Sequence, residues 1–556
     1  MTEKIFIGVA WPYANGPLHL GHIAGAYLPA DIFARYNRLK GNDVLMVSGS
    51  DQHGTPITVR AEQEGVSPAE VAQRWHEAFL ESWRRMGISF DLFTRTGTDN
   101  HYRIAQEMFT ALKEKGYIYP GKMTMLYCDK CNRFLPDRYV NGVCPHCRAA
   151  TRGDQCDACG KPLTPIDLIE PKCKHCQSTP ELKDTEHFFL KLSAFGEELT
   201  KWVSRQDHWK AHVKNFTLGF LREGLKDRAI TRDIDWGIPV PVSGFEDKRI
   251  YVWFEAVIGY LSAGMEWAER SGDKDAWKVF WQGDVKSYYF VGKDNVPFHT
   301  IIWPAMLMGR GDLNLPYDVP ANEFLTIKGR RLSTSLNWAV WLPDYLERYD
   351  PDPLRYFLSI NMPDESDSDF SWQEFVRRNN DELVATYGNL VHRVLTITYR
   401  NFDGKVPAPG EIDERSKTLL DKSEQIFNDV DALMGRCRFR EPLRAIMQLA
   451  QEANRYLDEK APWKSIKTNR EEAATSLYVA LSIISSLKTM LSPFLPFTCA
   501  KLHGLLGLPG TVEELGWSVA EIKPGQQLAK PEALFVKLDD SVVETEDAKL
   551  EGGRAA

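Results

Sequence analysis

The chain has 556 residues, of which 43% are hydrophobic and 26% charged, a composition typical of soluble globular proteins with three or four domains. Its net charge of -8 excludes a globally basic protein, so any nucleic-acid contact must come from a local patch. The start of the chain lacks the pattern of a secretory signal, and its most apolar segment is interrupted by Lys488 and two prolines, so we expect a cytoplasmic protein without a membrane-spanning segment.

The first predicted elements are a strand over 5–10 and a helix over 19–41, joined by the loop "WPYANGPL". The run "IFIGVA" has the length and β-branched content of a buried strand, and the loop then ends regular structure with proline, asparagine and glycine. His19 and His22 fall on the first turn of the helix, with Gly21 between them. In an open α/β sheet phosphates bind at this place, because free backbone N–H groups and the helix dipole face the crevice.

Strands and helices alternate over residues 1–118, as in the first half of a doubly wound parallel sheet. A cysteine-rich insertion follows over 119–230, and the alternation returns over 231–325. From about Pro343 the pattern is helical, with three long periodic segments, and the tail over 541–556 is polar without periodicity. We therefore expect an α/β fold with a Rossmann-type sheet, split by an insertion and followed by an all-α helix bundle.

Eight of the ten cysteines form four C-x-x-C pairs. In a chain without a secretory signal, such pairs are more typical of metal knuckles than of disulfides or redox dithiols. Eight thiolates are enough for two closed tetrahedral zinc sites, which are structural sites. Consecutive, nested and crossed pairings all fit the spacing, although the short gap between the second and third pairs makes the inner four the easiest to close. The pairs are Cys128/Cys131, Cys144/Cys147, Cys156/Cys159 and Cys173/Cys176, and we expect Cys437 and Cys499 to fill core positions.

Five ordered segments carry the most specific motifs of the chain: His19-Leu20-Gly21-His22, "RRLSTS", "SGSDQHGTPI", "YVWFEAVIGYL" and "GKDNVPFHTIIWPAML". The first two resemble the HIGH and KMSKS signatures of class I aminoacyl-tRNA synthetases. The other three, together with "RDIDWGIPVP", the cysteine pattern and "EKAPWK", resemble the methionyl-tRNA synthetase family of the archaeal and eukaryotic zinc-knuckle type. The resemblance covers about residues 4–500. It implies that the chain activates L-methionine with ATP to methionyl-adenylate and pyrophosphate, and then transfers methionine to the 3′-terminal ribose of tRNA(Met) in translation initiation and elongation.

The resemblance implies an ATP site, with magnesium bound to the nucleotide, between the two signatures. Such a site must align a carboxylate with the α-phosphate and stabilise charge on the phosphate oxygens, which imidazole donors and a bare backbone can do. In the KMSKS-type loop, arginine and threonine replace the two lysines of the family, so a neighbouring cation is needed to compensate. The implied ATP-binding and catalytic residues are His19, Gly21, His22, Lys328, Arg331, Ser333 and Thr334, and Ser335 completes the loop motif.

The resemblance also implies a methionine pocket, with a carboxylate for the ammonium group and an apolar wall for the polarizable thioether. Asp51 matches the family's carboxylate. Val257 and Asn295 are similar to the archaeal and eukaryotic type, since some bacterial relatives carry proline and isoleucine there, and Asp294 lies in the same segment. The implied methionine-binding residues are Trp11, Tyr13, Asp51, Trp253, Ala256, Tyr260, Asn295, His299 and Trp303.

In the helical part, the resemblance implies that an exposed tryptophan stacks on an anticodon base while side chains of another helix contact base edges. The implied residues are Asn389, Arg393, Pro462 and Trp463. By resemblance we also expect the two zinc sites to be nested, with the outer and the inner pairs each holding one ion, and we expect a monomer. The domains implied are the catalytic halves 1–118 and 231–325, the insertion 119–230, a linker domain with the KMSKS-type loop 326–385, the anticodon-binding domain 386–540 and the polar tail 541–556.

Two alternatives stay open from the sequence. A related class I synthetase for another apolar amino acid shares the first signature, but such enzymes carry a large editing domain where this chain has mostly cysteine knuckles. A tRNA-binding scaffold that has lost catalysis would explain Thr334, whereas the intact His19, His22 and Asp51 favour an active enzyme.

Overall fold

The computed structural model describes residues 2–136, 139–153, 156, 158–159, 161, 163–334 and 337–552. Its central feature is a five-stranded parallel sheet in the order β14-β13-β1-β2-β3. The chain adds strands on one side of β1 first and on the other side later, which is the doubly wound arrangement that the sequence predicted. The strands are β1 (Lys4–Val9), β2 (Asp43–Ser50), β3 (Leu92–Arg95), β13 (Lys286–Gly292) and β14 (Ala321–Asn322).

Side chains of β1 alternate between two buried clusters, one on each face of the sheet. Ile5, Ile7 and Val9 join the cluster that includes helices of the first face, whereas Phe6 joins the other cluster. A strand covered on both faces is expected to be apolar, and β1 is apolar and buried from Ile5 to Val9, after the exposed Lys4. The helices of the first face are α2 (Leu28–Leu39) and α4 (Pro68–Met86), and those of the second are α5 (Asp99–Glu114), α8 (Val252–Ser271) and α9 (Trp303–Arg310).

The first predicted helix exists, but as three consecutive pieces. α1 (Leu20–His22) passes into a π-helical turn, Ile23–Tyr27, and then into α2, and Gly41 follows its end with a φ of +77°. The predicted capped helix is α4. The Ser67 hydroxyl accepts from the Glu70 N–H and the Glu70 carboxylate accepts from the Ser67 N–H, so both ends of the capping box are made.

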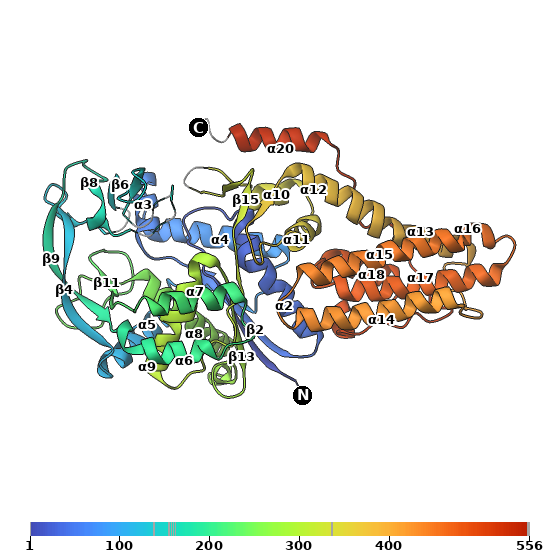
Figure 1. Cartoon of the computed structure of the whole chain (residues 1–556), viewed down its shortest axis with the longest axis horizontal. Coiled ribbons are helices and arrows are strands. Elements are labelled where there is room, and N and C mark those ends of the chain that lie inside the picture. Colours follow the sequence, from blue (N-terminus) through green and yellow to red (C-terminus); the bar gives the residue numbers. More distant parts are fainter. Residues whose placement is uncertain are drawn as a thin grey trace.

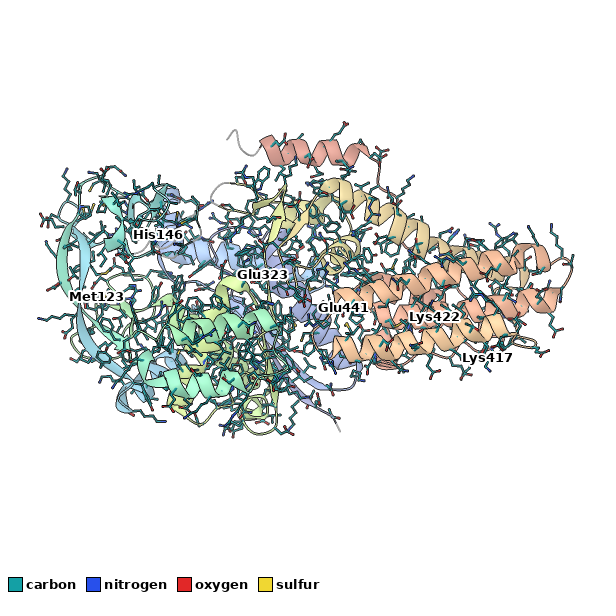
Figure 2. The ribbon with its side chains drawn as sticks, in the orientation of Figure 1. Met123, His146, Glu323, Lys417, Lys422 and Glu441 are labelled. Atoms are coloured by element: carbon teal, nitrogen blue, oxygen red, sulfur yellow. The ribbon has the colours of Figure 1, made fainter. Side chains whose placement is uncertain are left out.

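The insertion is built on a long antiparallel ribbon of β4 (Ile118–Cys128) and β9 (Glu181–Leu190). Figure 2 labels Met123 and His146 in this part of the chain, at the opposite end of the molecule from Lys417 and Lys422 in the helix bundle. The other elements of the insertion are β5 (Arg133–Phe134), β6 (Val140–Val143), β7 (Ala150–Arg152), the 3-10 turn Pro165–Asp167, β8 (Ile169–Cys173), the 3-10 turn Leu192–Phe195, α6 (Gly196–Ser204), α7 (Ala211–Arg222) and β10 (Arg228–Ala229).

Smaller elements lie between the main strands and helices and between the sheet and the bundle. A two-stranded pair, β11 (Thr231–Arg232) with β12 (Arg249–Ile250), precedes α8. α3 (Thr55–Glu64) follows β2, and short helical turns over Ala276–Phe280, Lys293–Asn295 and Phe298–Ile302 flank β13. The region after β14 contains a three-stranded sheet and three helices: β15 (Leu325–Ile327), β16 (Arg330–Arg331), β17 (Ser368–Phe370), α10 (Leu342–Arg348), α11 (Pro351–Ile360) and α12 (Trp372–Arg378).

The predicted helix bundle extends away from the sheet (Figure 1). One of its helices, α17 (Arg470–Leu491), is long and apolar enough by length and composition alone to cross a membrane. However, 89% of its most apolar window is buried inside the protein, as in the core helix of a bundle. The bundle comprises the π-helical stretch Asn379–Gly388, α13 (Asn389–Asn401), α14 (Glu414–Met434), α15 (Arg440–Lys460), α16 (Pro462–Ser465), α17 (Arg470–Leu491), α18 (Pro496–Leu505) and α19 (Val512–Leu515).

The expected polar tail is instead largely helical. α20 (Ser541–Gly552) packs beside α12 and lies near α10 and β15 (Figure 1). Glu546 is buried, and its carboxylate accepts two hydrogen bonds from Arg348, at 2.9 and 2.8 Å, and one from the Tyr349 hydroxyl. Tertiary charge pairing therefore fixes a helix whose sequence has no amphipathic period. Residues 553–556 of the predicted tail lie outside the described residues.

Candidate active site

A cavity of about 750 Å³ opens at the carboxyl ends of the central strands. Trp11 and Tyr13 follow β1, Asp51 follows β2, and the segment from Lys293 follows β13. Side chains of α8 close the other side. All the residues predicted for methionine except Trp303 line this cavity: Trp11, Tyr13, Asp51, Trp253, Ala256, Tyr260, Asn295 and His299, together with Val257 and Asp294.

Trp303 lies behind the cavity wall instead of in it. Its side chain is fully buried, and its ring packs edge to face against Trp281 with the ring centres 6.1 Å apart. Among the described residues, Trp303 therefore supports the wall without forming its surface.

Asp51 is the buried acid of the cavity. Its backbone N–H donates to the Pro12 carbonyl and its own carbonyl accepts from the Ala14 N–H, both at 2.8 Å, so the loop after β1 is tied to the end of β2. Burial, and then the charge of Glu255, raise the pKa of the Asp51 carboxyl well above its usual value. A cation beside Asp51 would favour the ionised form of this carboxyl and so oppose the effects of burial and of Glu255.

Tyr260 and His299 form a polar pair in the otherwise apolar wall. The Tyr260 hydroxyl lies 2.7 Å from His299 Nε2, and His299 Nδ1 lies 2.8 Å from the Asn295 carbonyl. Because a carbonyl only accepts, Nδ1 carries the imidazole proton and Nε2 accepts from Tyr260. Burial lowers the pKa of His299 to about 4, so the ring is neutral at pH 7. Trp253 closes the rim, and its indole N–H donates to the Tyr13 hydroxyl at 2.7 Å.

The two histidines of the first signature stack face to face. Their ring centres are 3.7 Å apart, with an angle of 14° between the ring planes. The backbone N–H of His19 donates to Nδ1 of the His22 ring at 3.1 Å. A Cβ on Gly21 would lie 3.1 Å from the His19 ring, so glycine leaves room for that ring. Burial lowers the pKa of His22 to about 4. Burial, and then the neighbouring His22, lower the pKa of His19 well below its usual value. Both imidazoles are therefore neutral. Nδ1 of His19 has no hydrogen-bond partner among the described residues.

The KMSKS-type loop lies against this histidine segment. Thr334 Cγ2 would be 3.1 Å from a Cβ on Gly16, and the chain after the loop hydrogen-bonds to the residues around His19, through Leu20 N–H to Val340 and Leu342 N–H to Leu18. Ser333 pairs through its backbone with Trp338. Ser335 lies outside the described residues. The loop that follows β16 and the loop that follows β1 thus form one surface.

The cations of the loop have different surroundings. Arg331 lines the cavity, with its guanidinium 4.0 Å from the centre of the Phe324 ring. Lys328 instead forms ion pairs with Asp547 and Glu551 of α20, at 3.3 and 2.9 Å. The structure therefore brings His19, Gly21, His22, Arg331, Ser333 and Thr334 into one region, whereas the Lys328 side chain is held by the C-terminal helix.

The eight cysteines form two groups with the nested pairing that the resemblance implied. Sγ–Sγ distances of 3.4 to 3.9 Å are too long for disulfide bonds. Four sulfurs placed about 2.3 Å from a central zinc ion in a tetrahedron are about 3.8 Å apart, so both groups fit such an ion. The groups are Cys128, Cys131, Cys173 and Cys176, and Cys144, Cys147, Cys156 and Cys159. Cys437 and Cys499 are buried core residues, as predicted.

The residues predicted for the anticodon meet on the bundle between α13 and α16. The Arg393 guanidinium lies 4.9 Å from the centre of the Trp463 ring and forms an ion pair with Asp458 at 2.8 Å. Trp463 is 36% exposed, and Asn389 is exposed one turn before Arg393. Pro462 is buried at the start of α16, so it directs the chain and offers no surface.

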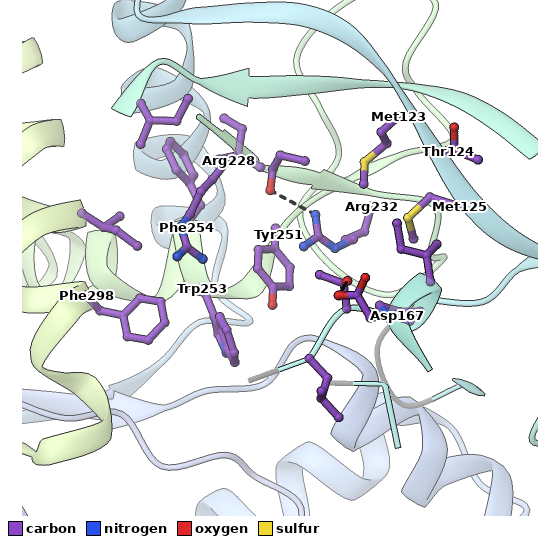
Figure 3. A pocket seen from close by; sticks show the side chains of 18 residues that line it. Met123, Thr124, Met125, Asp167, Arg228, Arg232, Tyr251, Trp253, Phe254 and Phe298 are labelled. Atoms are coloured by element: carbon purple, nitrogen blue, oxygen red, sulfur yellow. Dashed lines mark hydrogen bonds between the residues drawn. The ribbon is translucent and has the colours of Figure 1, made fainter. Parts of the chain in front are cut away.

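A second cavity, of about 450 Å³, was not predicted from the sequence (Figure 3). It shares four lining residues, Arg228, Trp253, Phe298 and Ile302, with the first cavity, and Met123 and Met125 of β4 form its far wall. The Arg232 guanidinium lies 3.7 Å from the centre of the Tyr251 ring. Arg232 belongs to the segment "RDIDWGIPVP", whose pattern gave no indication of this cavity.

Comparison with known proteins decides the family. The model of class I tRNA synthetases (M) matches residues 5–395, and that of the anticodon binding domain of methionyl tRNA ligase matches 406–555. The chain belongs to the methionyl-tRNA synthetase family. A methionine–tRNA ligase of Dehalococcoides mccartyi is 61% identical over 551 residues, 99% of this chain and 100% of that protein. One from Thermomicrobium roseum is 52% identical over 99% of each chain.

The structural comparison agrees with this family. The methionyl-tRNA synthetase of Mycobacterium tuberculosis in complex with methionyl-adenylate superposes with a TM-score of 0.81 at 26% identity, over 96% of this chain and 100% of that one. As a member of the family, the chain is an aminoacyl-tRNA ligase that activates methionine and charges tRNA, and neither alternative from the sequence is favoured. The likeness of Val257 and Asn295 to archaeal and eukaryotic enzymes stays a prediction.

Proposed function

We propose that methionine binds in the 750 Å³ cavity with its ammonium group on Asp51 and its thioether between Trp11, Tyr260 and His299. The observation that carries this assignment is a single buried acid facing an apolar wall that contains one neutral polar pair. An amino acid with a long, uncharged and polarizable side chain satisfies both features. Ala256 and Asn295 complete the wall, and Tyr13 and Trp253 close the rim.

The ATP phosphates would lie beside the stacked histidines and the KMSKS-type loop. A neutral imidazole donates an N–H to a phosphate oxygen without adding a buried charge, and the charge that builds on that oxygen in the transition state strengthens the bond. Arg331 supplies the cation of the loop, and Ser333 and Thr334 add hydroxyl donors. Lys328 would reach the pyrophosphate only after leaving Asp547 and Glu551. Magnesium would arrive bound to ATP.

The remaining parts of the chain would serve tRNA. We infer that Trp463 stacks on a base of the tRNA(Met) anticodon while Asn389 and Arg393 contact base edges. One zinc ion in each cysteine group would hold the insertion in shape. The domain division we propose is the one expected from the sequence, except that α20 (Ser541–Gly552) occupies most of the range 541–556 that was expected to be a polar tail. We also infer a cytoplasmic monomer.

The test is ATP–pyrophosphate exchange with each of the twenty amino acids, followed by charging of tRNA(Met). Methionine should support exchange at a far higher kcat/KM than any other amino acid, and charging should require all three substrates. Preference for isoleucine, valine or leucine would favour the related synthetases. Binding of tRNA without any exchange would favour a scaffold that has lost catalysis.

A further inference from the structure

A cluster of three buried polar side chains, Glu255, His53 and His101, lies behind the residues that line the methionine cavity and does not itself line it. Glu255 of α8 is fully buried, and its two carboxylate oxygens lie 2.7 Å from His53 Nδ1 and 2.6 Å from His101 Nε2. Both histidines are also buried. A buried carboxylate is costly unless each oxygen has a donor, and here each oxygen has one.

His53 touches both carboxylates of this region. Its backbone N–H lies 3.3 Å from Asp51 Oδ1, and its ring N–H donates to Glu255. The Tyr102 hydroxyl, 3.0 Å from His53 Nε2, holds the other side of the ring. A change at Glu255 therefore acts on the residue that orients the Asp51 carboxylate.

His101 extends the cluster to Trp11, the aromatic wall of the cavity. The two rings are 6.4 Å apart, and Ser262 Oγ lies 2.8 Å from His101 Nδ1. Trp11 has little freedom, since a Cβ on Gly49 or on Gly259 would collide with its ring. The cluster thus supports both the acid and the wall that we assign to methionine.

The charges of the cluster act on Asp51 as well. Burial works against ionisation of Glu255, but His53 and His101 outweigh it and hold its pKa below the usual value, so it carries a negative charge. That charge adds to burial in raising the pKa of Asp51. Two carboxylates in one buried region favour a ligand that brings a positive charge.

We propose that Glu255 is a positioning residue for the ammonium group of methionine: through His53 it orients Asp51, and its charge makes the cavity select a cationic amino group over a neutral one. This inference rests on the proposed assignment of Asp51 to that group. Glu255 itself contacts no substrate, because it does not line either cavity.

The test compares the Glu255→Gln variant with the unaltered full-length protein in ATP–pyrophosphate exchange. KM for methionine should rise at least about tenfold, since one histidine loses its acceptor and the charge is removed, while KM for ATP stays within about twofold. The decisive readout is selectivity. The ratio of the affinity for methionine to that for its α-hydroxy analogue, measured as an inhibitor of exchange, should fall at least about tenfold. An unchanged ratio, or equal rises of both KM values, would overturn the proposal.

A matched control is Glu266→Gln on the same helix. Glu266 is also buried, accepts from the Thr94 hydroxyl at 2.7 Å, and lies outside both cavities, so this variant should keep both KM values and the ratio. Glu255→Asp keeps the charge but withdraws the carboxylate, and should raise KM for methionine while keeping the ratio. If Glu255→Gln gives no folded protein, Glu255→Asp decides the question. An unchanged KM for methionine, or a fall in the ratio of the affinities for methionine and its α-hydroxy analogue, would then contradict the proposal.

The Asp51→Asn variant tests the role of Asp51 separately from the role of Glu255. If Asp51→Asn leaves KM for methionine unchanged, the assignment of Asp51 to the ammonium group is wrong. If Asp51→Asn raises KM for methionine but Glu255→Gln does not, the assignment stands and only the role of Glu255 is wrong.

Discussion

The rings of His19 and His22 stack at 3.7 Å, and the backbone N–H of His19 donates to Nδ1 of His22. Since the His22 ring is neutral and its Nδ1 accepts, its proton is on Nε2. A donor fixed in this way needs no rearrangement when charge builds on a phosphate oxygen, which is the condition for effective transition-state stabilisation. The hydrogen bond therefore fixes the tautomer of His22, and the stack fixes the orientation of both rings.

Replacing His22 with alanine should remove that donor. We expect methionine-dependent exchange to slow by about 10² to 10³, the loss typical of one such donor. Binding of methionine alone, followed by tryptophan fluorescence, should change little because His22 does not line the methionine cavity. Exchange at the unaltered rate would contradict the phosphate role, and loss of methionine binding as well would indicate a folding defect.

A buried histidine away from the proposed substrates should make stability depend on pH. Burial lowers the pKa of His76 to about 4, and its Nδ1 lies 2.8 Å from Ser50 Oγ. Between about pH 6.5, the pKa in the unfolded chain, and pH 4, the unfolded state binds more protons than the folded state at this site. Acid should therefore destabilise the unaltered protein relative to His76→Gln, by at most about 1.4 kcal/mol per pH unit.

The measurement is the difference in free energy of unfolding between the two proteins from pH 7.5 to pH 4.5. The difference in free energy of unfolding should be constant above about pH 6.5. Below that pH the unaltered protein should lose stability relative to His76→Gln. Using a difference removes the contribution of buried acids with raised pKa values, such as Asp318 at about 7, which changes in the opposite direction in both proteins. A difference that is flat across the whole range would show that His76 titrates normally.

Metal analysis tests the two cysteine groups separately. We expect about two zinc ions per chain, and about one in Cys128→Ser or Cys144→Ser, because each substitution opens one closed site. Cys437→Ser is the matched control, since Cys437 is a buried cysteine outside both groups and its replacement should leave the metal content unchanged. A ratio near one in the unaltered protein would mean that one group binds no zinc.

Trp463 should separate tRNA recognition from amino-acid activation. Trp463→Ala removes base stacking of about 1–3 kcal/mol, so charging of tRNA(Met) should fall at least tenfold in kcat/KM. Exchange should stay within about twofold, because the tryptophan is in α16 of the bundle and not in the cavity. Equal losses in both assays would point to misfolding, and unchanged charging would make Trp463 a packing residue for Arg393.

Much of the fold could be predicted because it depends on local patterns. The β1 strand, the break after it and the Ser67 capping box are each encoded within a few residues. The cysteine groups could be predicted as metal sites from spacing, but their nesting needed either a relative or the path of β4 and β8, since spacing alone permits three pairings.

The features that could not be predicted depend on contacts between distant segments. α20 has only Glu546 and Leu550 buried, so its sequence has no periodic signal and its position depends on Arg348. The same helix explains why Lys328 faces away from the cavity. Glu255 looks like an ordinary polar residue in an apolar run, and only the fold brings His53 and His101 to it.

We propose that one cavity binds methionine through Asp51 and joins it to ATP beside His19 and His22. The sharpest test is a crystal structure of the protein with a non-hydrolysable methionyl-adenylate analogue. The ammonium group should lie about 3 Å from the Asp51 carboxylate, the thioether between Tyr260 and His299, and the phosphate-like group next to the stacked histidines. An analogue bound in the second cavity, beside Tyr251 and Met125, would show that neither Asp51 nor the stacked histidines bind the substrates.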